Sequence, residues 1–232
     1  MAQDLTPAII LVNPQLGQNI GASARAMLNF GLSDLRIVNP RDGWPNEAAI
    51  DNAAHVVASA KIYATLEEAI ADVQVVYACS ARARYMNKPV LPAGAAAASI
   101  RASNAISAII FGCERSGLSN DDIVLANYIV SIDVNKECSS LNLASAVGII
   151  SYEWFNRCIA PTQTNAIDLA DQGEVNNFLT QLEAMLTDAD FFKEPAKKPG
   201  MIRNIRNMIK RITPLTSQDI RTLHGIINAL HR

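Results

Sequence analysis

Residues 8–27, AIILVNPQLGQNIGASARAM, join a short apolar run to a helical stretch of small residues that carries one arginine. The run from Ala8 to Val12 is apolar at every position, which is typical of a strand buried on both faces of a parallel sheet. The stretch from Ile20 to Phe30, closed by Gly31, has the spacing of a helix that packs on such a sheet. This segment therefore predicts a strand, a loop and a helix.

The same alternation continues along the chain. Four further apolar runs predict buried strands at residues 35–39, 73–79, 106–112 and 129–134. Helices are expected at 47–61, at 66–71 behind an N-cap at Thr65, and from about 141 through 155. Alternating strands and helices indicate an α/β fold, in which a mostly parallel sheet has helices on both faces.

The composition changes near Pro161, which predicts a boundary between a domain at 1–160 and a helical extension at 161–232. Helices are expected in the extension at 174–187, 201–211 and 217–230, with a Lys-Pro-rich linker at 195–200. An extension of this length is too short to bury a core alone, so we expect it to pack on the first domain or on a partner.

The formal net charge is −2, which argues against a protein that coats nucleic acid by bulk charge. The charges are nevertheless unevenly distributed. Residues 160–190 contain six acids and no base, whereas residues 191–211 contain seven bases and one acid, Glu194. The basic block predicts contact with an RNA backbone, and the alternative is a solvated helix face.

Several classes of protein are disfavoured. No apolar run is long enough for a transmembrane helix and no signal peptide is visible, so a cytoplasmic protein without membrane contact is expected. The four cysteines and three histidines show no metal-ligand spacing, so no metal is expected. Gly112 and Gly117 have P-loop spacing, but Leu118 stands where the lysine must be, and no G-x-G-x-x-G occurs. Any chemistry therefore uses an organic cofactor or none.

Ligands of such sheets bind beyond the carboxyl ends of the strands, which draws attention to the loops there. With Asn19 as N-cap, the helix at 20–30 would bury Ile20, Ala24, Met27 and Leu28. The side chain of Arg25 would pass over Gly21 toward the crevice, because helical side chains lean toward the N-terminus. The alternative is an arginine that reaches solvent or pairs with Glu114. Likewise, Ser139, Ser140 and Asn142 could simply cap the helix that follows them.

Taken together, three segments resemble the ordered motifs of the SpoU (TrmH) branch of the SPOUT RNA methyltransferases. They are N-I-G-x-x-x-R at 19–25, F-G-x-E-x-x-G-L at 111–118 and S-S-L-N-L-A-x-A-V at 139–147. The resemblance covers residues 8 to about 157. The run Ser80-Ala-Arg-Ala-Arg84 and the segment Leu223-His-Gly-Ile226 are most similar to the TrmJ-type subfamily.

The resemblance implies a domain with a C-terminal trefoil knot that binds S-adenosylmethionine (SAM) and releases S-adenosylhomocysteine. It also implies a homodimer, with which a hydrophobic fraction of 50% and only 18% charged residues are compatible. The implied cofactor-binding residues are Cys79, Ser80, Ala81, Gly112, Ile132, Ser139, Ser140 and Leu141. The implied catalytic residues are Arg25, Asn19, Glu114, Ser140 and Asn142.

For the TrmJ type the implied reaction is methylation of a ribose 2′-hydroxyl in tRNA, at position 32 of the anticodon loop, on cytidine or uridine. The alternatives are methylation of ribosomal RNA and a knotted RNA-binding protein without catalysis. Because an arginine side chain has a pKa above 12, we expect Arg25 to position phosphate and stabilise an oxyanion rather than to act as a base. The candidate RNA-binding residues are Arg82, Arg84, Lys88, Arg203, Arg206, Lys210 and Arg211.

Overall fold

The structure is a computed structural model that describes residues 6–50, 53–81, 87–138, 140–156, 168–212 and 214–230. Its centre is a seven-stranded sheet in the order β3-β2-β1-β6-β4-β7-β5, and every pair of neighbours is parallel. The strands are β1 (Ala8–Val12), β2 (Leu35–Val38), β3 (Lys61–Tyr63), β4 (Val75–Cys79), β5 (Val90–Pro92), β6 (Ser107–Phe111) and β7 (Tyr128–Ser131). The parallel α/β prediction is confirmed.

The five apolar runs are all strands, and their burial explains their composition. In β1, Ile9 and Leu11 contact one core cluster, whereas Ala8, Ile10 and Val12 contact another on the opposite face. Both faces are covered, so no position is left for a polar side chain. The strands β3 and β5 were not predicted, because each has three residues, lies at an edge and exposes part of its length.

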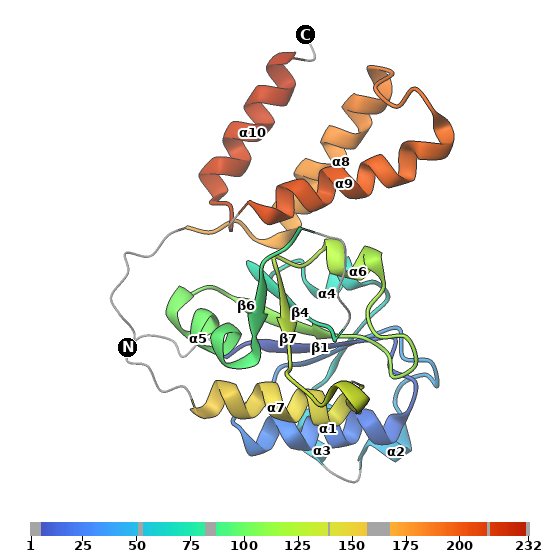
Figure 1. The fold of residues 1–232 in the computed structure, drawn as a ribbon, viewed down its shortest axis with the longest axis vertical. Coiled ribbons are helices and arrows are strands. Elements are labelled where there is room, and N and C mark those ends of the chain that lie inside the picture. The colour runs from blue at the N-terminus through green and yellow to red at the C-terminus, as the bar shows by residue number, and fades with distance from the viewer. Residues whose placement is uncertain are drawn as a thin grey trace.

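Helices cover both faces of the sheet (Figure 1). One face carries the larger core cluster, to which α1, α2, α3, α5 and α7 contribute, and the other carries α4 and α6. Their bounds are α1 (Gly17–Asn29), α2 (Glu47–Ile50), α3 (Ala54–Ala58), α4 (Leu66–Ala69), α5 (Ala93–Ser103), α6 (Asn120–Val124) and α7 (Leu143–Asn156). Thr65 caps α4 in a capping box with Glu68, as its position before the acidic first turn predicts.

The single helix expected at 47–61 is wrong, because the chain forms two short helices there and then enters β3. The close packing of α2 on α1 shows how tertiary contacts override the local pattern. A Cβ atom added to Gly21 on α1 would lie 2.5 Å from the Ala49 carbonyl oxygen on α2. Gly21 therefore allows the two helices to touch backbone to backbone.

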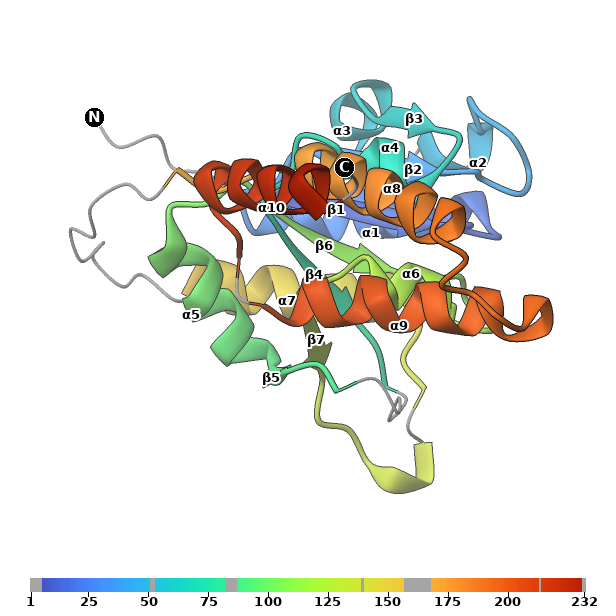
Figure 2. The same ribbon diagram turned by 90° about the horizontal axis from the view of Figure 1, so that it is seen from above.

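The C-terminal residues form the helices α8 (Gln172–Asp188), α9 (Lys198–Arg211) and α10 (Ser217–Leu230), which share a core cluster of their own. They extend from one end of the sheet domain, and α9 packs beside α6 (Figures 1 and 2). The prediction of a linker at 195–200 is wrong, because Pro195–Lys197 is a 3₁₀ turn and α9 begins at Lys198. A proline is tolerated in the first turn of α9, because the backbone N–H that it lacks would have no partner in the helix.

The extension is joined to the sheet at the amino end of β4. Gln172 donates through its backbone N to the Val73 carbonyl (2.6 Å) and through Nε2 to the Gln74 carbonyl (2.9 Å). Gln74 in turn donates through Nε2 to the Leu169 carbonyl (2.6 Å). The extension therefore packs on the sheet domain, as expected. The expectation that it is too short to bury a core alone is wrong, because its helices share the cluster that includes Phe178, Leu179 and Ile220. None of the described helices is long and apolar enough to cross a membrane.

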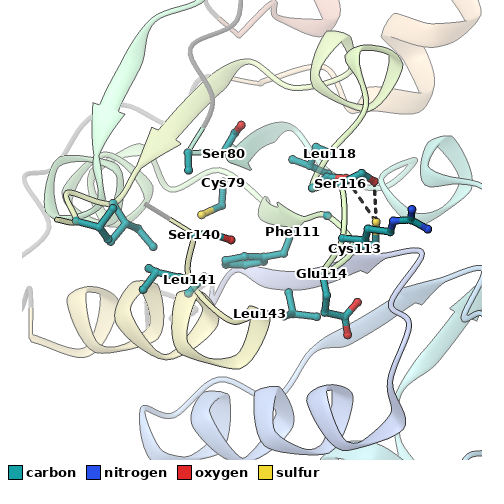
Figure 3. A pocket seen from close by; sticks show the side chains of 17 residues that line it. Cys79, Ser80, Phe111, Cys113, Glu114, Ser116, Leu118, Ser140, Leu141 and Leu143 are labelled. Atoms are coloured by element: carbon teal, nitrogen blue, oxygen red, sulfur yellow. Dashed lines mark hydrogen bonds between the residues drawn. The ribbon is translucent and has the colours of Figure 1, made fainter. Parts of the chain in front are cut away.

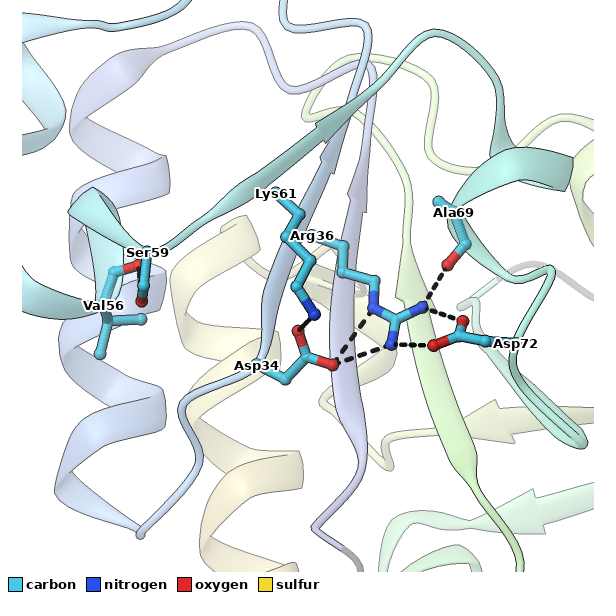
Figure 4. A network of polar contacts seen from close by, with 7 residues as sticks. All are labelled: Asp34, Arg36, Val56, Ser59, Lys61, Ala69 and Asp72. Atoms are coloured by element: carbon cyan, nitrogen blue, oxygen red, sulfur yellow. Dashed lines mark hydrogen bonds and ion pairs between the residues drawn. The ribbon is translucent and has the colours of Figure 1, made fainter.

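A buried guanidinium holds α4 against the strand β2 at the same edge (Figure 4). Arg36 is 4% exposed and is bonded to both Asp34 (2.9 Å) and Asp72 (3.0 Å) as well as to the Ala69 carbonyl. The hydrogen bonds and charge of the two carboxylates outweigh burial and raise the pKa of Arg36, while Arg36 keeps the pKa of Asp72 low despite partial desolvation. The ion-pair network of Arg36 with Asp34 and Asp72 therefore stabilises the fold, and it lies away from the carboxyl ends of the strands.

Candidate cofactor and RNA site

A partly open cavity lies beyond the carboxyl ends of β4, β6 and β7 (Figure 3). Every described member of the cofactor set lines it: Cys79, Ser80, Ala81, Gly112, Ile132, Ser140 and Leu141. Ser139, the remaining member, lies outside the described residues. Parallel strands bring these segments together because their carboxyl ends meet at one edge of the sheet.

Sequence reasoning missed other residues that line the cavity, among them Phe111, Val134, Leu143 and Ala146. They supply its apolar surface. Leu143 and Ala146 lie three residues apart in the first turns of α7, so the helical spacing beyond the third motif was a signal for them. The cavity thus has an apolar part and a polar part that includes Glu114, Arg115 and Ser116, a mixture that suits an adenosine-sized organic ligand.

Position 112 has no room for a side chain, because the loop after β6 folds back on Gly112. A Cβ atom there would lie 2.1 Å from both the Gly117 carbonyl carbon and the Leu118 nitrogen. Gly117 adopts a φ of +68°, a conformation that favours glycine, and donates to the Cys113 carbonyl (2.8 Å). The two glycines therefore build a tight reverse turn at the cavity wall, which is a different structure from a phosphate-binding P-loop.

Glu114 joins the loop after β6 to the start of α1. Its carboxylate accepts hydrogen bonds from Asn19 Nδ2 (2.7 Å), from the Gln15 backbone N (2.9 Å) and from the Leu16 backbone N (3.3 Å). Burial favours the protonated carboxyl, but the bond from Asn19 and the backbone N–H groups outweigh it and lower the pKa of Glu114. Glu114 is therefore a charged anchor for the loop that precedes α1.

Asn19 extends this network to the third motif. Its Oδ1 accepts a hydrogen bond from Asn142 Nδ2 (3.1 Å), and Asn142 Oδ1 accepts one from the Ala144 backbone N (2.9 Å) at the start of α7. Asn142 thus caps α7, as the alternative interpretation held, and also contacts Asn19. The chain Glu114–Asn19–Asn142 connects three segments that lie far apart in the sequence.

Two details of the α1 prediction are wrong. Asn19 is not the N-cap, because α1 begins at Gly17 behind Leu16, which makes no side-chain cap. Leu28 is 38% exposed rather than buried. Ile20, Ala24 and Met27 are buried as expected. Because the helix starts three residues earlier than expected, Asn19 lies within its first turn and uses both ends of its amide in the network.

Arg25 is exposed on α1, one turn beyond Gly21 and less than two turns beyond Asn19. The close approach of Gly21 to Ala49 accounts for that glycine, so Gly21 is a packing residue rather than a passage for the Arg25 side chain. The three described bonds of the Glu114 carboxylate go to the α1 loop and Asn19. Arg25 thus extends from the helix whose first turn this network holds in place.

Lys88 and Lys210 do not face solvent, so the prediction that they contact RNA is wrong. Lys88 is 7% exposed, and its Nζ donates to the Val124 (3.2 Å) and Ala126 carbonyls at the end of α6. Lys210 is 2% exposed, and its Nζ donates to Gln172 Oε1. Burial lowers the pKa of Lys88 to about 8 and that of Lys210 to about 7. Lys210 supports the joint between the extension and the sheet, whereas Lys88 holds the segment before β5 against the end of α6.

The other basic candidates differ in accessibility. Arg206 is partly buried and its Nε is 2.6 Å from Glu183 Oε1. Arg203 is exposed and 3.5 Å from Asp121 at the start of α6, and Arg211 is exposed. Arg82 and Arg84 lie outside the described residues. Of the four named candidates on α9, Arg203 and Arg211 are therefore the exposed ones that remain for RNA contact.

A parallel α/β sheet with a ligand cavity at its carboxyl edge, bordered by loops linked through Glu114, Asn19 and Asn142, defines a class of cofactor-dependent α/β enzymes. One such class of enzymes is the SpoU rRNA Methylase family, and the model of that family matches residues 6–152 of this chain. The chain belongs to the SpoU methylase family.

The chain is also similar to particular members over nearly its full length. It is 37% identical to the tRNA (cytidine/uridine-2′-O-)-methyltransferase TrmJ of Salmonella typhimurium, over 97% of this chain and 96% of that protein. The crystal structure of TrmJ from Z. mobilis ZM4 matches with a TM-score of 0.91 at 42% identity, over 98% of this chain and all of that one. AviRb from Streptomyces viridochromogenes, in complex with the cofactor AdoMet, shares the fold with a TM-score of 0.53 at 20% identity, over 68% of this chain and 62% of that chain.

Proposed function

We propose that this protein transfers a methyl group from SAM to a ribose 2′-hydroxyl of tRNA, in the anticodon loop at position 32. The observation that carries the proposal is the Glu114–Asn19–Asn142 network, which joins all three motifs beside the cavity and orients the helix that bears Arg25. The full-length similarity to TrmJ supports tRNA as the substrate. A tRNA substrate is consistent with a cytoplasmic location.

The cavity residues fit the cofactor by their chemistry. The carboxyl ends of β4, β6 and β7 offer backbone groups from Cys79, Gly112 and Ile132. Apolar side chains such as Phe111 and Leu143 line another part of the cavity. The reverse turn at Gly112 brings backbone where a side chain would otherwise fill the space. SAM supplies an activated methyl group on its sulfonium, and S-adenosylhomocysteine is the product that leaves. Ser140 and Leu141 border the same cavity from the third motif, next to Asn142.

Two different roles follow for the charged residues. Glu114 is a positioning residue, because its lowered pKa makes it a weak base and its oxygens are held by the α1 loop and Asn19. The guanidinium of Arg25 stabilises negative charge on the ribose oxygen while it holds a neighbouring phosphate. The proton of the hydroxyl then leaves to that phosphate or to water. Methyl transfer also requires the oxygen, the methyl carbon and the sulfur to lie in line.

We also propose that the active form is a homodimer that covers the outer faces of α1 and α7. These helices lie side by side (Figure 1), and Phe30 contacts Tyr152 (5.7 Å between ring centroids) and Phe155 (6.1 Å). Tyr152 is 48% exposed and Phe155 is 55% exposed. Exposed aromatic groups that are already packed against one another are typical of the core of an interface. The helix that carries Arg25 would thus border the second subunit.

The experiment that tests the reaction is methyl transfer from labelled SAM to separate pools of tRNA and ribosomal RNA, taken from cells that lack this gene. Mass spectrometry of nuclease digests then locates the modified nucleoside. Label in 2′-O-methylcytidine or 2′-O-methyluridine of tRNA is expected. Label only in ribosomal RNA would show that ribosomal RNA is the substrate instead of tRNA, as the name of the matching family suggests. RNA binding without label in either pool would indicate a non-catalytic protein.

A further inference from the structure

The loop after β2 places an arginine, Arg41, beside the loop that Glu114 anchors. The backbone N of Arg41 donates to the Pro14 carbonyl (3.1 Å). Pro14 directly precedes Gln15 and Leu16, whose backbone N–H groups donate to the Glu114 carboxylate. The main chain at Arg41 is therefore fixed relative to the start of α1, although Arg41 lies in the loop after β2 and α1 follows β1.

The side chain of Arg41 is available to a ligand. It is 55% exposed, and the partner that the structure gives it is the adjacent Asp42, at 2.9 Å from Nε to Oδ1. An exposed pair of this kind contributes little to stability and exchanges readily with another anion. The hydrogen bond and charge of Asp42, with a further contribution from the charge of Glu114, raise the pKa of Arg41, so the group stays cationic and within electrostatic range of the site.

The chemistry of the substrate requires more than one phosphate contact. A ribose 2′-oxygen is attached beside the carbon that carries the 3′-phosphodiester, and another phosphate lies on the 5′ side. A single guanidinium on α1, that of Arg25, leaves at least one of these phosphates to other groups. A guanidinium presents paired N–H donors that match two phosphate oxygens, which a single ammonium group does not.

We propose that Arg41 binds a backbone phosphate of the RNA substrate in place of Asp42 and thereby positions the target ribose, an inference that rests on the proposed function. Arg41 and Arg25 then hold the RNA from the β2 loop and from α1. Asp42 acts as an internal competitor that occupies the guanidinium when RNA is absent. This competition favours release of the product and disfavours weakly bound anions.

The test compares Arg41→Ala with Lys61→Ala as a matched control. Lys61 is also exposed (58%) and also pairs weakly with an aspartate, Asp34 at 3.5 Å, but it begins β3 at the amino edge of the sheet. For Arg41→Ala, the Kd for tRNA is expected to rise about tenfold, as for the loss of one charge-assisted contact. The slope of log Kd against log salt should fall by about 0.7–0.9, the value for one phosphate. Lys61→Ala should change neither quantity.

Two further variants separate charge from geometry. Arg41→Lys keeps the charge and should retain most of the salt slope while it loses part of the affinity, because a single ammonium replaces the paired donors. Asp42→Asn removes the competitor and should tighten tRNA binding. The Kd for SAM, measured without RNA, should be the same in all four variants and the wild type.

The outcomes distinguish this inference from the proposed function. If the wild type methylates tRNA while Arg41→Ala and Lys61→Ala give the same Kd and salt slope, Arg41 has no phosphate role and the proposed function stands. If the wild type binds tRNA without methylating it, the proposed function fails, and the tRNA affinity and salt slope still decide the role of Arg41.

Discussion

Asn19 offers the sharpest perturbation of the network, because its amide holds Glu114 on one side and Asn142 on the other. In Asn19→Ala the carboxylate loses its shortest hydrogen bond, worth about 1.5–3 kcal/mol for a charged acceptor. Alanine inside a helix returns roughly 0.5–0.7 kcal/mol relative to asparagine. The expected loss of unfolding free energy is therefore about 1–2.5 kcal/mol, which urea denaturation measures.

The effect on the reaction should be larger than the effect on stability. Loss of orientation between α1 and the third motif is expected to lower the rate of methyl transfer at saturating SAM and tRNA by about 100-fold. The Kd for SAM should change little, because Asn19 does not line the cavity. Single-turnover kinetics and calorimetric titration separate the two quantities.

The pH dependence provides an independent readout of the same contact. Glu114 has a lowered pKa in the folded protein, so its contribution to stability is complete above the ordinary carboxyl pKa and is lost as the pH falls through the folded value. The stability difference between the wild type and Asn19→Ala should therefore be full at pH 7 and shrink below about pH 4.

Asn29→Ala is the matched control, since it makes the same substitution at the exposed last residue of α1. It should leave the methyl-transfer rate near that of the wild type. If Asn19→Ala were as active as Asn29→Ala, the network would not orient the reacting groups, and the argument for Glu114 and Asn142 as positioning residues would fail with it.

Three further predictions address other parts of the molecule. Arg25→Ala should lower methyl transfer by about 1,000-fold or more, as for loss of a main electrostatic stabiliser, yet keep the Kd for SAM within a few-fold; near-normal turnover would exclude this role. Because folding lowers the pKa of Lys210 to about 7, the unfolded chain binds more protons than the folded one, so stability should rise with pH from about 7 to 10. Lys210→Met should flatten this rise when the free energy of unfolding is measured by urea denaturation across that range. Equal slopes in the wild type and the variant would contradict the assignment to Lys210. Phe155→Glu should shift a dimer to monomers in light scattering, and a protein that is monomeric before substitution would refute the interface.

Much of the fold could be predicted from the residues because its main signals are local. The runs at β1, β2, β4, β6 and β7 are apolar throughout, since both faces of the sheet are covered. The capping boxes of α4 and α8 depend on residues three positions apart, so local sequence suffices for them as well. The strand β3 carries too few residues for a periodic pattern. The helix α6, which was not predicted, has a local signal of the same kind as α4, a capping box of Ser119 with Asp122.

The resemblance to the SpoU family supplied the individual cofactor residues, and only the edge where they meet was accessible from the strand pattern itself, because parallel strands bring their carboxyl ends together. The contact Glu114–Asn19, between residues 95 positions apart, was not. Nor did the basic block reveal that Lys210 is buried while Arg203 is exposed, since both lie on α9 and only the packing of that helix distinguishes its faces. The trefoil knot stays a prediction.

The sequence by itself determined the parallel α/β class and the three motifs, because periodicity and motif spacing are local properties. The resemblance that those motifs carry named several of the residues that line the cofactor cavity. Tertiary structure alone decided which polar groups meet. It made Asn19 a link instead of a cap and Gly21 a contact between helices. It also buried Lys88 against the end of α6 and Lys210 at the domain joint, where neither is an RNA ligand. The physical reason is that hydrogen-bond partners and burial depend on distances between segments remote in the chain, which no local pattern encodes.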